Sequence, residues 1–378
     1  MIFSDGDNFR DSRPLGIVAR LLRQLHLDGP LLLALITVAS LGMLVLFSAS
    51  GQDSGIVIKQ AIRFGISLVA LIMVAQVPPH FLRLLAPWFY LAALMLLFGV
   101  LLTGDVGKGA QRWLNLGLIR FQPSEIMKLA LPLMAAWYLH QRPLPPGFIS
   151  IFSVAILVCV PTILIGMQPD LGTALLIAAS GTIVIILAGM TIRMLLAAFV
   201  VLLAMAPVLW SFMQDYQRQR VLTFLNPETD PLGAGYHIIQ SKIALGSGGV
   251  FGKGWNNGTQ AQLDFLPERS TDFIFAVLGE EFGLIGIVVL LAIYVFIIAR
   301  GLLISAQAQN TFSRLLAGAI SLTFFVYVFV NAGMVTGLLP VVGVPLPLVS
   351  YGGTSMVTLM AGFGILMSIQ TNRKLLST

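Results

Sequence analysis

Ten stretches of about 20 predominantly apolar residues recur along this chain, and they limit its fold more than any other feature. A helix of that length crosses the hydrocarbon core of a bilayer. Hydrophobic residues make up 57% of the chain and charged residues only 10%, which is typical of a polytopic membrane protein. The sequence predicts an all-α protein with about ten transmembrane helices, near residues 30–49, 56–77, 81–103, 122–140, 147–167, 171–189, 193–213, 272–299, 314–339 and 353–370.

The chain outside these runs divides into a basic start, one large loop and a short tail. Residues 1–29 are polar, and Leu15–Leu27 could form an amphipathic helix on the cytoplasmic face. The run from Leu31 is too long for a signal peptide, so we expect an uncleaved span. Residues 30–371 would form one ten-span domain, with an outer loop at 214–271 between spans seven and eight and a tail at 372–378. The only cysteine, Cys159, excludes a disulfide within the chain.

The basic residues of the short loops indicate the orientation. Short cytoplasmic loops are enriched in lysine and arginine, whereas long translocated loops do not follow this rule. With the N-terminus inside, the inner segments hold half of the 22 lysines and arginines, namely Arg10, Arg13, Arg20, Arg23, Arg83, Arg142, Arg193, Arg300, Arg314, Arg373 and Lys374. We therefore expect both termini in the cytoplasm. These basic ends also explain the net charge of +6, so we expect no nucleic-acid partner.

The outer segments carry most of the unusual sequence. The stretch from Asp215 to Asp272 is the one long hydrophilic run. Such loops are usually functional or disordered, and Tyr236, Trp255 and Phe265 favour an ordered loop. We expect it to lie over a site at the membrane surface. The apolar stretch Leu339–Thr354 contains three prolines and three glycines, which makes a continuous helix improbable.

Several carboxylates lie at the ends of spans or inside them. Asp272 begins the eighth span, where it could cap the helix or, facing a cavity, act as a base. Glu125 and Lys128 are three residues apart and so share one helix face, as a stabilising pair or as part of a site. Asp170 could cap the span that follows it. Of the adjacent Glu280 and Glu281, at least one should face the protein interior.

Basic side chains are frequent in the outer segments, whereas Lys59 and Arg63 near the outer end of span two fit ordinary snorkelling. Many could be solvated or paired with acids, but arginine and lysine also suit the phosphate oxygens of an anionic substrate. Trp113 could stack on a sugar or belong to an interfacial belt. The sequence has no P-loop and no zinc-ligand spacing. The outer basic residues are Lys108, Arg112, Arg120, Arg218, Arg220, Lys242, Lys253 and Arg269.

A family resemblance extends over nearly the whole chain from about residue 30. The run from Asn331 to Gly353, NAGMVTGLLPVVGVPLPLVSYGG, resembles the C-terminal signature of the RodA/FtsW/SpoVE (SEDS) family. Four shorter motifs match in the expected order: GAQRW ending at Trp113, FQPSE ending at Glu125, QPDLGT beginning at Gln168, and TDFIF beginning at Thr271. The loop sequences DYQRQR and GAGYHIIQSK are most similar to the RodA branch of Gram-negative bacteria.

The resemblance implies a peptidoglycan glycosyltransferase with the ten-span SEDS fold, which is similar to lipid-using GT-C glycosyltransferases. Such an enzyme polymerises lipid II into β-1,4 glycan strands, with inversion, on the periplasmic face of the bacterial inner membrane during elongation of rod-shaped cells. Its implied partners are a class B penicillin-binding protein, lipid II, undecaprenyl pyrophosphate and membrane lipid. A lipid II flippase and a scaffold for the penicillin-binding protein are the alternatives.

The resemblance also assigns roles to residues. Asp272 would be the catalytic base or would bind a divalent cation, Mg²⁺ or Mn²⁺, although the sequence has no dedicated metal motif. Arg112 and Lys242 would hold phosphates, and Trp113 would line the substrate site. Glu125, Lys128 and Asp170 would shape or polarise the cavity. Arg218, Arg220 and Ser350 complete the expected substrate-binding set.

Overall fold

The computed structural model describes residues 22, 24–107, 110–115, 120–213, 215–229, 233–263, 265–266 and 268–372. Some of the predictions fall wholly or mainly outside these ranges. They concern the N-terminal segment with the expected amphipathic helix Leu15–Leu27, the C-terminal tail, and the basic residues Arg10, Arg13, Arg20, Arg23, Lys108, Arg373 and Lys374. In the described part, each of the ten predicted apolar runs forms a helix. These helices are α2 (Gly29–Ala49), α3 (Ser54–Ala75), α4 (Pro79–Thr103), α5 (Pro123–His140), α6 (Phe148–Met167), α7 (Leu171–Leu187), α8 (Ile192–Phe212), α12 (Ile274–Ala306), α13 (Thr311–Val335) and α14 (Thr354–Thr371).

Seven of the described helices are long and apolar enough to cross a membrane, namely α2, α3, α4, α6, α12, α13 and α14. The apolar helices α7 and α8 are also present, with shorter apolar stretches. Large apolar side chains such as Trp88, Phe148 and Ile149 are more than two-thirds exposed, as expected for surfaces that face lipid. The protein is a multi-pass membrane protein, and the count of ten spans stays a prediction.

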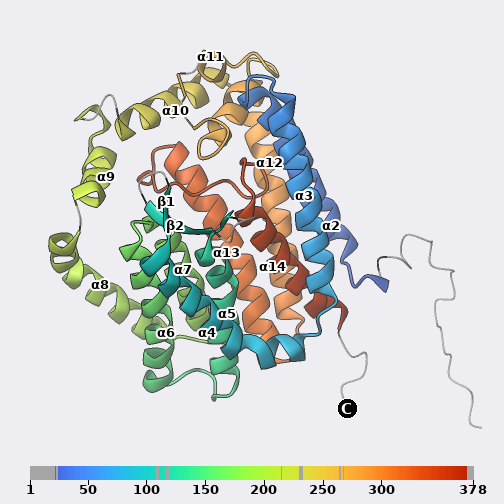
Figure 1. The fold of residues 1–378 in the computed structure, drawn as a ribbon, viewed down its shortest axis with the longest axis vertical. Coiled ribbons are helices and arrows are strands. Elements are labelled where there is room, and N and C mark those ends of the chain that lie inside the picture. The colour runs from blue at the N-terminus through green and yellow to red at the C-terminus, as the bar shows by residue number, and fades with distance from the viewer. Residues whose placement is uncertain are drawn as a thin grey trace, which may run out of the picture.

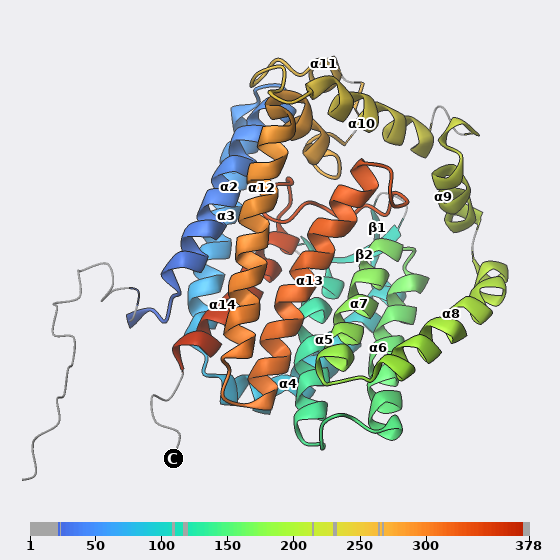
Figure 2. The ribbon, with the colours of Figure 1, turned by 180° about the vertical axis from the view of Figure 1, so that it is seen from behind.

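The bundle is built around α13 (Figures 1 and 2). In its most apolar stretch, 56% of the residues are buried, and α13 packs against α5, α7, α12 and α14. On one side, α3 packs against α14 and α2 packs against α12. On the other side, α4 packs on α5 and α6 packs on α7. Helix α8 diverges from this bundle, and its side chains are largely exposed.

The predicted outer loop is mostly helical. It contains α9 (Asp215–Leu225), the 3₁₀ helix η1 (Pro227–Thr229), α10 (Ala234–Gly248) and α11 (Thr259–Gln262). Helices α10 and α11 lie over one end of the bundle (Figure 1). The opposite end holds the contacts between Asp28 and Arg300 and between Ser368 and Val77. The first described residues and the end of α14 therefore lie at one end, as an even number of crossings requires.

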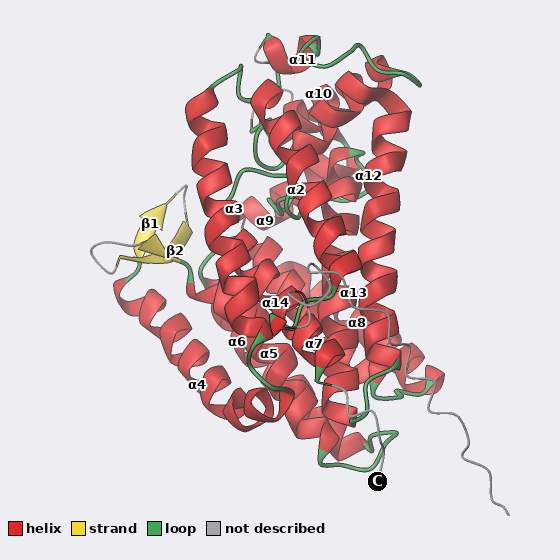
Figure 3. Cartoon of the chain, turned by 90° about the vertical axis from the view of Figure 1, so that its right-hand side faces the viewer, coloured by secondary structure: helices red, strands yellow, loops and turns green. Residues whose placement is uncertain are grey.

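The all-α prediction misses one small sheet. Strands β1 (Asp105–Gly107), β2 (Ala110–Asn115) and β3 (Arg120–Phe121) pair antiparallel in the order β1–β2–β3. The sheet projects beside the upper end of α4 (Figure 3). Residues of β2 contact both α4 and α5, so the sheet brings Arg112 and Trp113 to the side of the bundle.

Helix α12 is interrupted at Gly283, within the predicted eighth span. Gly283 has φ 64° and ψ −162°, a conformation that is accessible essentially to glycine alone. The segment 249–254 supplies the missing backbone partners: Lys253 N–H donates to Glu280 O at 3.0 Å and Leu284 N–H donates to Gly249 O at 3.0 Å. A Cβ at position 283 would lie 2.3 Å from the Gly252 nitrogen. The loop and the broken helix thus pack backbone against backbone.

Candidate active site

The segment 339–353 is non-helical, as predicted, and it is fastened to the turn that carries Asp272. Ser350 Oγ donates to Thr271 O at 2.5 Å and accepts from Leu346 N–H at 2.8 Å. Tyr351 N–H donates to Ser270 O at 2.8 Å. Non-helical backbone at membrane depth needs such internal partners. Ser350 therefore serves here as a fastener between the two segments.

Asn331 on α13 completes this support. It is fully buried, and its amide donates to the Asp272 carbonyl at 2.9 Å and to the Val344 carbonyl at 2.7 Å. The half-buried Asp272 carboxylate faces Gly343, where a Cβ would lie 3.5 Å from Oδ2. The N-cap position predicted for Asp272 is off by one residue, because Phe273 is the N-cap of α12 and makes no side-chain capping bond. Asp272 lies in the turn that leads into the helix.

A cavity of about 860 Å³ opens between α3, β2, α5 and α14. Its polar wall combines Arg112, Trp113 and Gln122 with Arg63 of α3. Arg63, interpreted from the sequence as a snorkelling residue, also packs against the protein, because its guanidinium carbon lies 4.4 Å from the centre of the Tyr351 ring. The remaining lining residues are Ile66, Phe89, Phe121, Ile126, Leu129, Gly353, Thr354, Val357, Thr358 and Ala361.

An apolar groove of about 400 Å³ adjoins this cavity. The two share Phe89, Leu129 and Ala361. The groove is lined otherwise by Val74, Val77, Leu82, Leu85, Ala86, Leu133 and Ile365. A basic, aromatic compartment that continues into an apolar one suits an amphiphile with an anionic head group and a hydrocarbon chain.

Arg112 and Asp170 are held together at the cavity wall. Arg112 Nη1 lies 3.5 Å from Asp170 Oδ2, and Gln122 Nε2 donates to the same oxygen at 3.3 Å. The predicted capping role of Asp170 is confirmed, because it is the N-cap of α7 and accepts from Thr173 N–H at 3.3 Å. One carboxylate therefore both starts α7 and orients Arg112.

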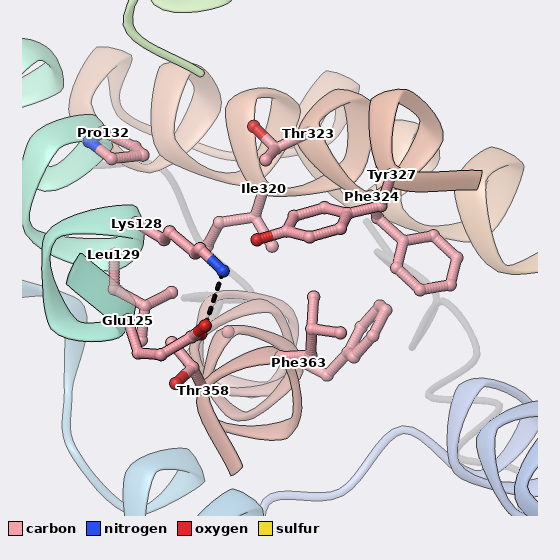
Figure 4. A pocket seen from close by; sticks show the side chains of 12 residues that line it. Glu125, Lys128, Leu129, Pro132, Ile320, Thr323, Phe324, Tyr327, Thr358 and Phe363 are labelled. Carbon is pink, nitrogen blue, oxygen red and sulfur yellow. Dashed lines mark hydrogen bonds and ion pairs between the residues drawn. The ribbon is translucent and has the colours of Figure 1, made fainter. Parts of the chain in front are cut away.

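Glu125 and Lys128 form the predicted pair on one face of α5, with Lys128 Nζ 2.7 Å from Glu125 Oε1 (Figure 4). The ammonium also lies 5.2 Å from the centre of the Tyr327 ring. Both line a small cavity between α5, α13 and α14, of about 30 Å³. Within the described structure, Glu125 Oε2, Tyr327 Oη and Thr323 Oγ1 are buried without a hydrogen-bond partner. This pocket shares Leu129 and Thr358 with the large cavity.

The other predicted site residues lie elsewhere. Arg218 on α9 donates to the carbonyls of Trp210 and Ser211 at 3.1 and 2.9 Å, so it satisfies the end of α8. Arg220 is on the same helix. The side chain of Lys242 on α10 packs directly against Gly337. A Cβ atom at position 337 would lie 2.2 Å from the Lys242 Cε. The structure thus brings Arg112, Trp113, Glu125 and Lys128 to the cavity walls. Asp170 contacts Arg112 but, like Asp272 and Ser350, lines none of these three cavities of the described structure.

Sequence reasoning missed four residues of this region: Arg63, Gln60, Asn331 and Tyr351. Gln60 Nε2 donates to Ser350 O at 3.1 Å, and Gly352 N–H donates to Gln60 Oε1 at 3.3 Å. A polar and a charged residue three apart in an otherwise apolar run were the available signal for Gln60 and Arg63. Asn331 and Tyr351 lay within the signature motif, but their contacts are made between distant segments.

The sequence profile of the FtsW/RodA/SpoVE family, described as cell cycle proteins, matches residues 25–375. This chain belongs to that family. It is 55% identical over 355 residues to the peptidoglycan glycosyltransferase MrdB of Escherichia coli K12, covering 94% of this chain and 96% of the relative. It is 36% identical over 354 residues to MrdB of Helicobacter pylori, covering 91% and 90%.

Solved structures of family relatives have the same fold. A chain of a peptidoglycan synthase complex, studied for its coordination of polymerization and crosslinking, superposes with a TM-score of 0.80 at 31% identity, covering 91% of this chain and 97% of that one. The rod shape determining protein RodA of Thermus thermophilus gives 0.70 at 29% identity, covering 92% and 97%. The family predicted from the motifs is confirmed.

Proposed function

We propose that this protein is a peptidoglycan glycosyltransferase that polymerises lipid II at the outer face of the bacterial inner membrane during elongation of rod-shaped cells. The 55% identity to a protein of that activity over most of both chains supports the reaction class. The proposed substrate, an anionic lipid, is supported by the large cavity, which is lined by Arg63, Arg112 and Trp113 and adjoins an apolar groove. Lipid II, with a disaccharide, a pyrophosphate and a polyprenyl chain, has the matching sequence of chemical groups.

In the proposed reaction, the 4-hydroxyl oxygen of an incoming GlcNAc attacks C1 of the sugar at the reducing end of the growing strand. The bond between C1 and the pyrophosphate oxygen breaks, and that oxygen keeps the electron pair. An α-linked pyrophosphate becomes a β-1,4 bond. The hydroxyl proton passes to the carboxylate of Asp272, which acts as the general base. Basic side chains stabilise the leaving undecaprenyl pyrophosphate.

Hydrogen bonds to the backbone around Asp272 suit it to act as a base. Its backbone is held by Asn331, and its turn is held by Ser350. A base must be placed within hydrogen-bond reach of the proton that it removes, and two independent fasteners restrict the turn. Ser350 and Asn331 would thus position the base. Arg112, Trp113 and Asp170 would bind or orient the substrate, and Lys242, Arg218 and Arg220 would act through the outer loop.

Among the residues that the structure describes, no group of three histidine, cysteine, aspartate or glutamate side chains could hold a metal ion. A divalent cation shared by Asp272 and a pyrophosphate stays an expectation from the family resemblance, and no step above depends on it.

A class B penicillin-binding protein is the proposed partner, because the similar solved chain belongs to a peptidoglycan synthase complex. We also propose that all ten apolar helices span the membrane, that both termini are cytoplasmic, and that residues 214–271 form the periplasmic loop. Helices α10 and α11 at one end of the bundle would then lie outside the membrane.

The test is strand formation from purified lipid II by the wild type and by Asp272→Asn, each with a partner that has no glycosyl transfer activity of its own. We expect strands from the wild type and a loss of about 100-fold or more in the variant. Asp215→Asn is the matched control, because Asp215 is fully exposed on α9, and it should retain activity. Equal strands from wild type and Asp272→Asn would remove Asp272 from the chemistry, and none from the wild type would favour a flippase or scaffold.

A further inference from the structure

The charged side chain of Arg63 points from an apolar helix toward the interior of the protein. It lies on the membrane-spanning helix α3 and lines the large cavity. Its guanidinium stacks on the Tyr351 ring, and a Cβ at Gly353 would lie 3.4 Å from its Nε. The guanidinium is thus held beside an aromatic ring and close to the backbone at Gly353, while Arg63 lines the cavity.

No carboxylate lies within ion-pair distance of Arg63 among the described residues, unlike the other arginines of the bundle interior. Arg112 is paired with Asp170, and Arg300 is paired with Asp28 at 2.6 Å. Stacking on an aromatic ring contributes about 0.5 to 2 kcal/mol and leaves the charge in place. A charge at membrane depth normally has a partner or serves a ligand. The described chain gives Arg63 an aromatic contact but no carboxylate to balance its charge. We therefore expect its ligand to be an anion.

The shape of the cavity restricts that anion. The space beside Arg63 continues past Phe89 and Leu129 into the apolar groove. A free phosphate ion would leave the groove without an occupant, whereas a prenyl pyrophosphate would place its chain there and its charges at the arginine. The planar fork of arginine binds phosphate oxygens through two parallel hydrogen bonds.

Arg63 is also linked to the Asp272 turn through one residue. The ring on which it stacks belongs to Tyr351, whose N–H donates to Ser270 O. Gln60, one helical turn before Arg63, is bonded to both Ser350 and Gly352. A phosphate held by Arg63 would therefore lie beside the segment that carries the carboxylate.

We propose that Arg63 binds the pyrophosphate of the lipid-linked donor and holds it against the turn that carries Asp272. This inference rests on the proposed polymerase function and adds a phosphate-binding residue that the motifs of the family do not contain. Arg63 and Arg112 would contact the head group from the walls formed by α3 and β2.

The first experiment measures binding without turnover. The midpoint of thermal unfolding is recorded for the purified protein in detergent with farnesyl pyrophosphate and, separately, with farnesol, which lacks the charge. We expect the pyrophosphate to stabilise the wild type more than farnesol does. Arg63→Gln should lose this additional shift and keep the response to farnesol. Lys59→Gln is the matched control, because Lys59 is exposed one turn away on α3, and it should behave as the wild type.

The second experiment measures strand formation against lipid II concentration. Arg63→Gln should raise KM about tenfold, as expected for the loss of one charged hydrogen-bonded contact, and Arg63→Lys should restore part of it. An unchanged KM together with an unchanged pyrophosphate shift would overturn the proposal. An equal shift from phosphatidylglycerol in mixed micelles would assign Arg63 to membrane phospholipid and also overturn it. A wild type that binds farnesyl pyrophosphate but makes no strands would leave this site standing and refute the polymerase.

Discussion

Among the described residues, two buried glutamates are each paired with a lysine, Glu280 with Lys253 and Glu125 with Lys128, but only Glu280 has hydrogen-bond partners for both of its oxygens. Glu280 is fully buried at the α12 break, where Lys253 Nζ lies at 2.7 Å, Thr259 Oγ1 at 3.0 Å and the Gln260 N–H nitrogen at 3.1 Å. Glu125 has an equally short contact with Lys128, but its second oxygen has no partner among the described residues. The first pair fastens a loop to a helix. The second lines the small cavity that shares Leu129 and Thr358 with the large one.

We expect this difference to separate an ion pair that only stabilises the fold from one that takes part in a site. A buried carboxylate is costly unless hydrogen bonds satisfy it, and at Glu280 the chain meets that requirement with local donors. At Glu125 the polar atoms that lack partners, including Tyr327 Oη and Thr323 Oγ1, surround a shared cavity. Loss of the first pair should therefore reduce stability, and loss of the second should reduce activity.

The largest effect on stability is expected for Glu280→Ala. The variant leaves the Lys253 ammonium and the Gln260 N–H without their acceptor, and we expect a loss of about 3 to 5 kcal/mol. The midpoint of thermal unfolding in detergent measures it. Glu228→Ala, at an exposed glutamate of η1, should leave the midpoint unchanged. A midpoint for Glu280→Ala equal to that of the wild type would show that the contacts at α12 do not stabilise the fold.

A smaller loss of stability with a larger loss of activity is expected for Lys128→Met. The variant leaves Glu125 beside a cavity, and we expect a cost of about 1 to 3 kcal/mol. Strand formation from lipid II should fall by roughly tenfold or more, because Lys128 lines the small cavity, whose wall includes Leu129 and Thr358 of the large one. Lys59→Met serves as the exposed control. If Lys128→Met kept full activity and lost as much stability as Glu280→Ala, the two pairs would be equivalent and the distinction would fail.

The smallest effect is expected for Tyr327→Phe. The Tyr327 hydroxyl is buried without a hydrogen bond of good geometry among the described residues. The Lys128 ammonium lies close to it, and the ring that this ammonium contacts is retained in the variant. We expect a change in the free energy of unfolding within about 0.5 kcal/mol. Tyr294→Phe is the matched comparison, because that hydroxyl donates to Pro347 O at 2.7 Å, and its loss should cost about 1 kcal/mol. Equal costs would reveal a contact to the Tyr327 hydroxyl that the described chain does not supply.

Apolar run length predicted the helices of the bundle well. Every predicted run forms a helix, and the non-helical stretch after α13 begins where proline and glycine accumulate. The predicted boundaries were wrong where an apolar run continues beyond the end of its helix. The ninth span was extended to residue 339, but α13 ends at Val335, because apolar residues continue into the irregular segment. The strands β1 to β3 were missed, since they are short and gain stability by packing on α4 and α5.

The candidate site was predicted in part. The spacing of Glu125 and Lys128 placed them correctly, and both Glu280 and Glu281 are buried, where at least one was expected. The roles of Arg63 and Arg218 were not predictable, because each depends on a contact with another part of the fold: the Tyr351 ring and the last carbonyls of α8. Hydropathy describes a residue's own segment, whereas these roles depend on tertiary contacts.

The break at Gly283 has a mechanical consequence for an enzyme embedded in lipid. Membrane helices tilt to match the thickness of the surrounding bilayer. In α12 the part from Leu284 to Ala306 is separated from the part that begins at Ile274 by a non-helical residue. At the break, segment 249–254 is bonded to both parts of α12, and the turn before Ile274 is bonded to α13 and to residues 346–351. We therefore expect changes in membrane thickness to be absorbed by the far end of α12, below these contacts, while the carboxylate of Asp272 keeps its depth and direction.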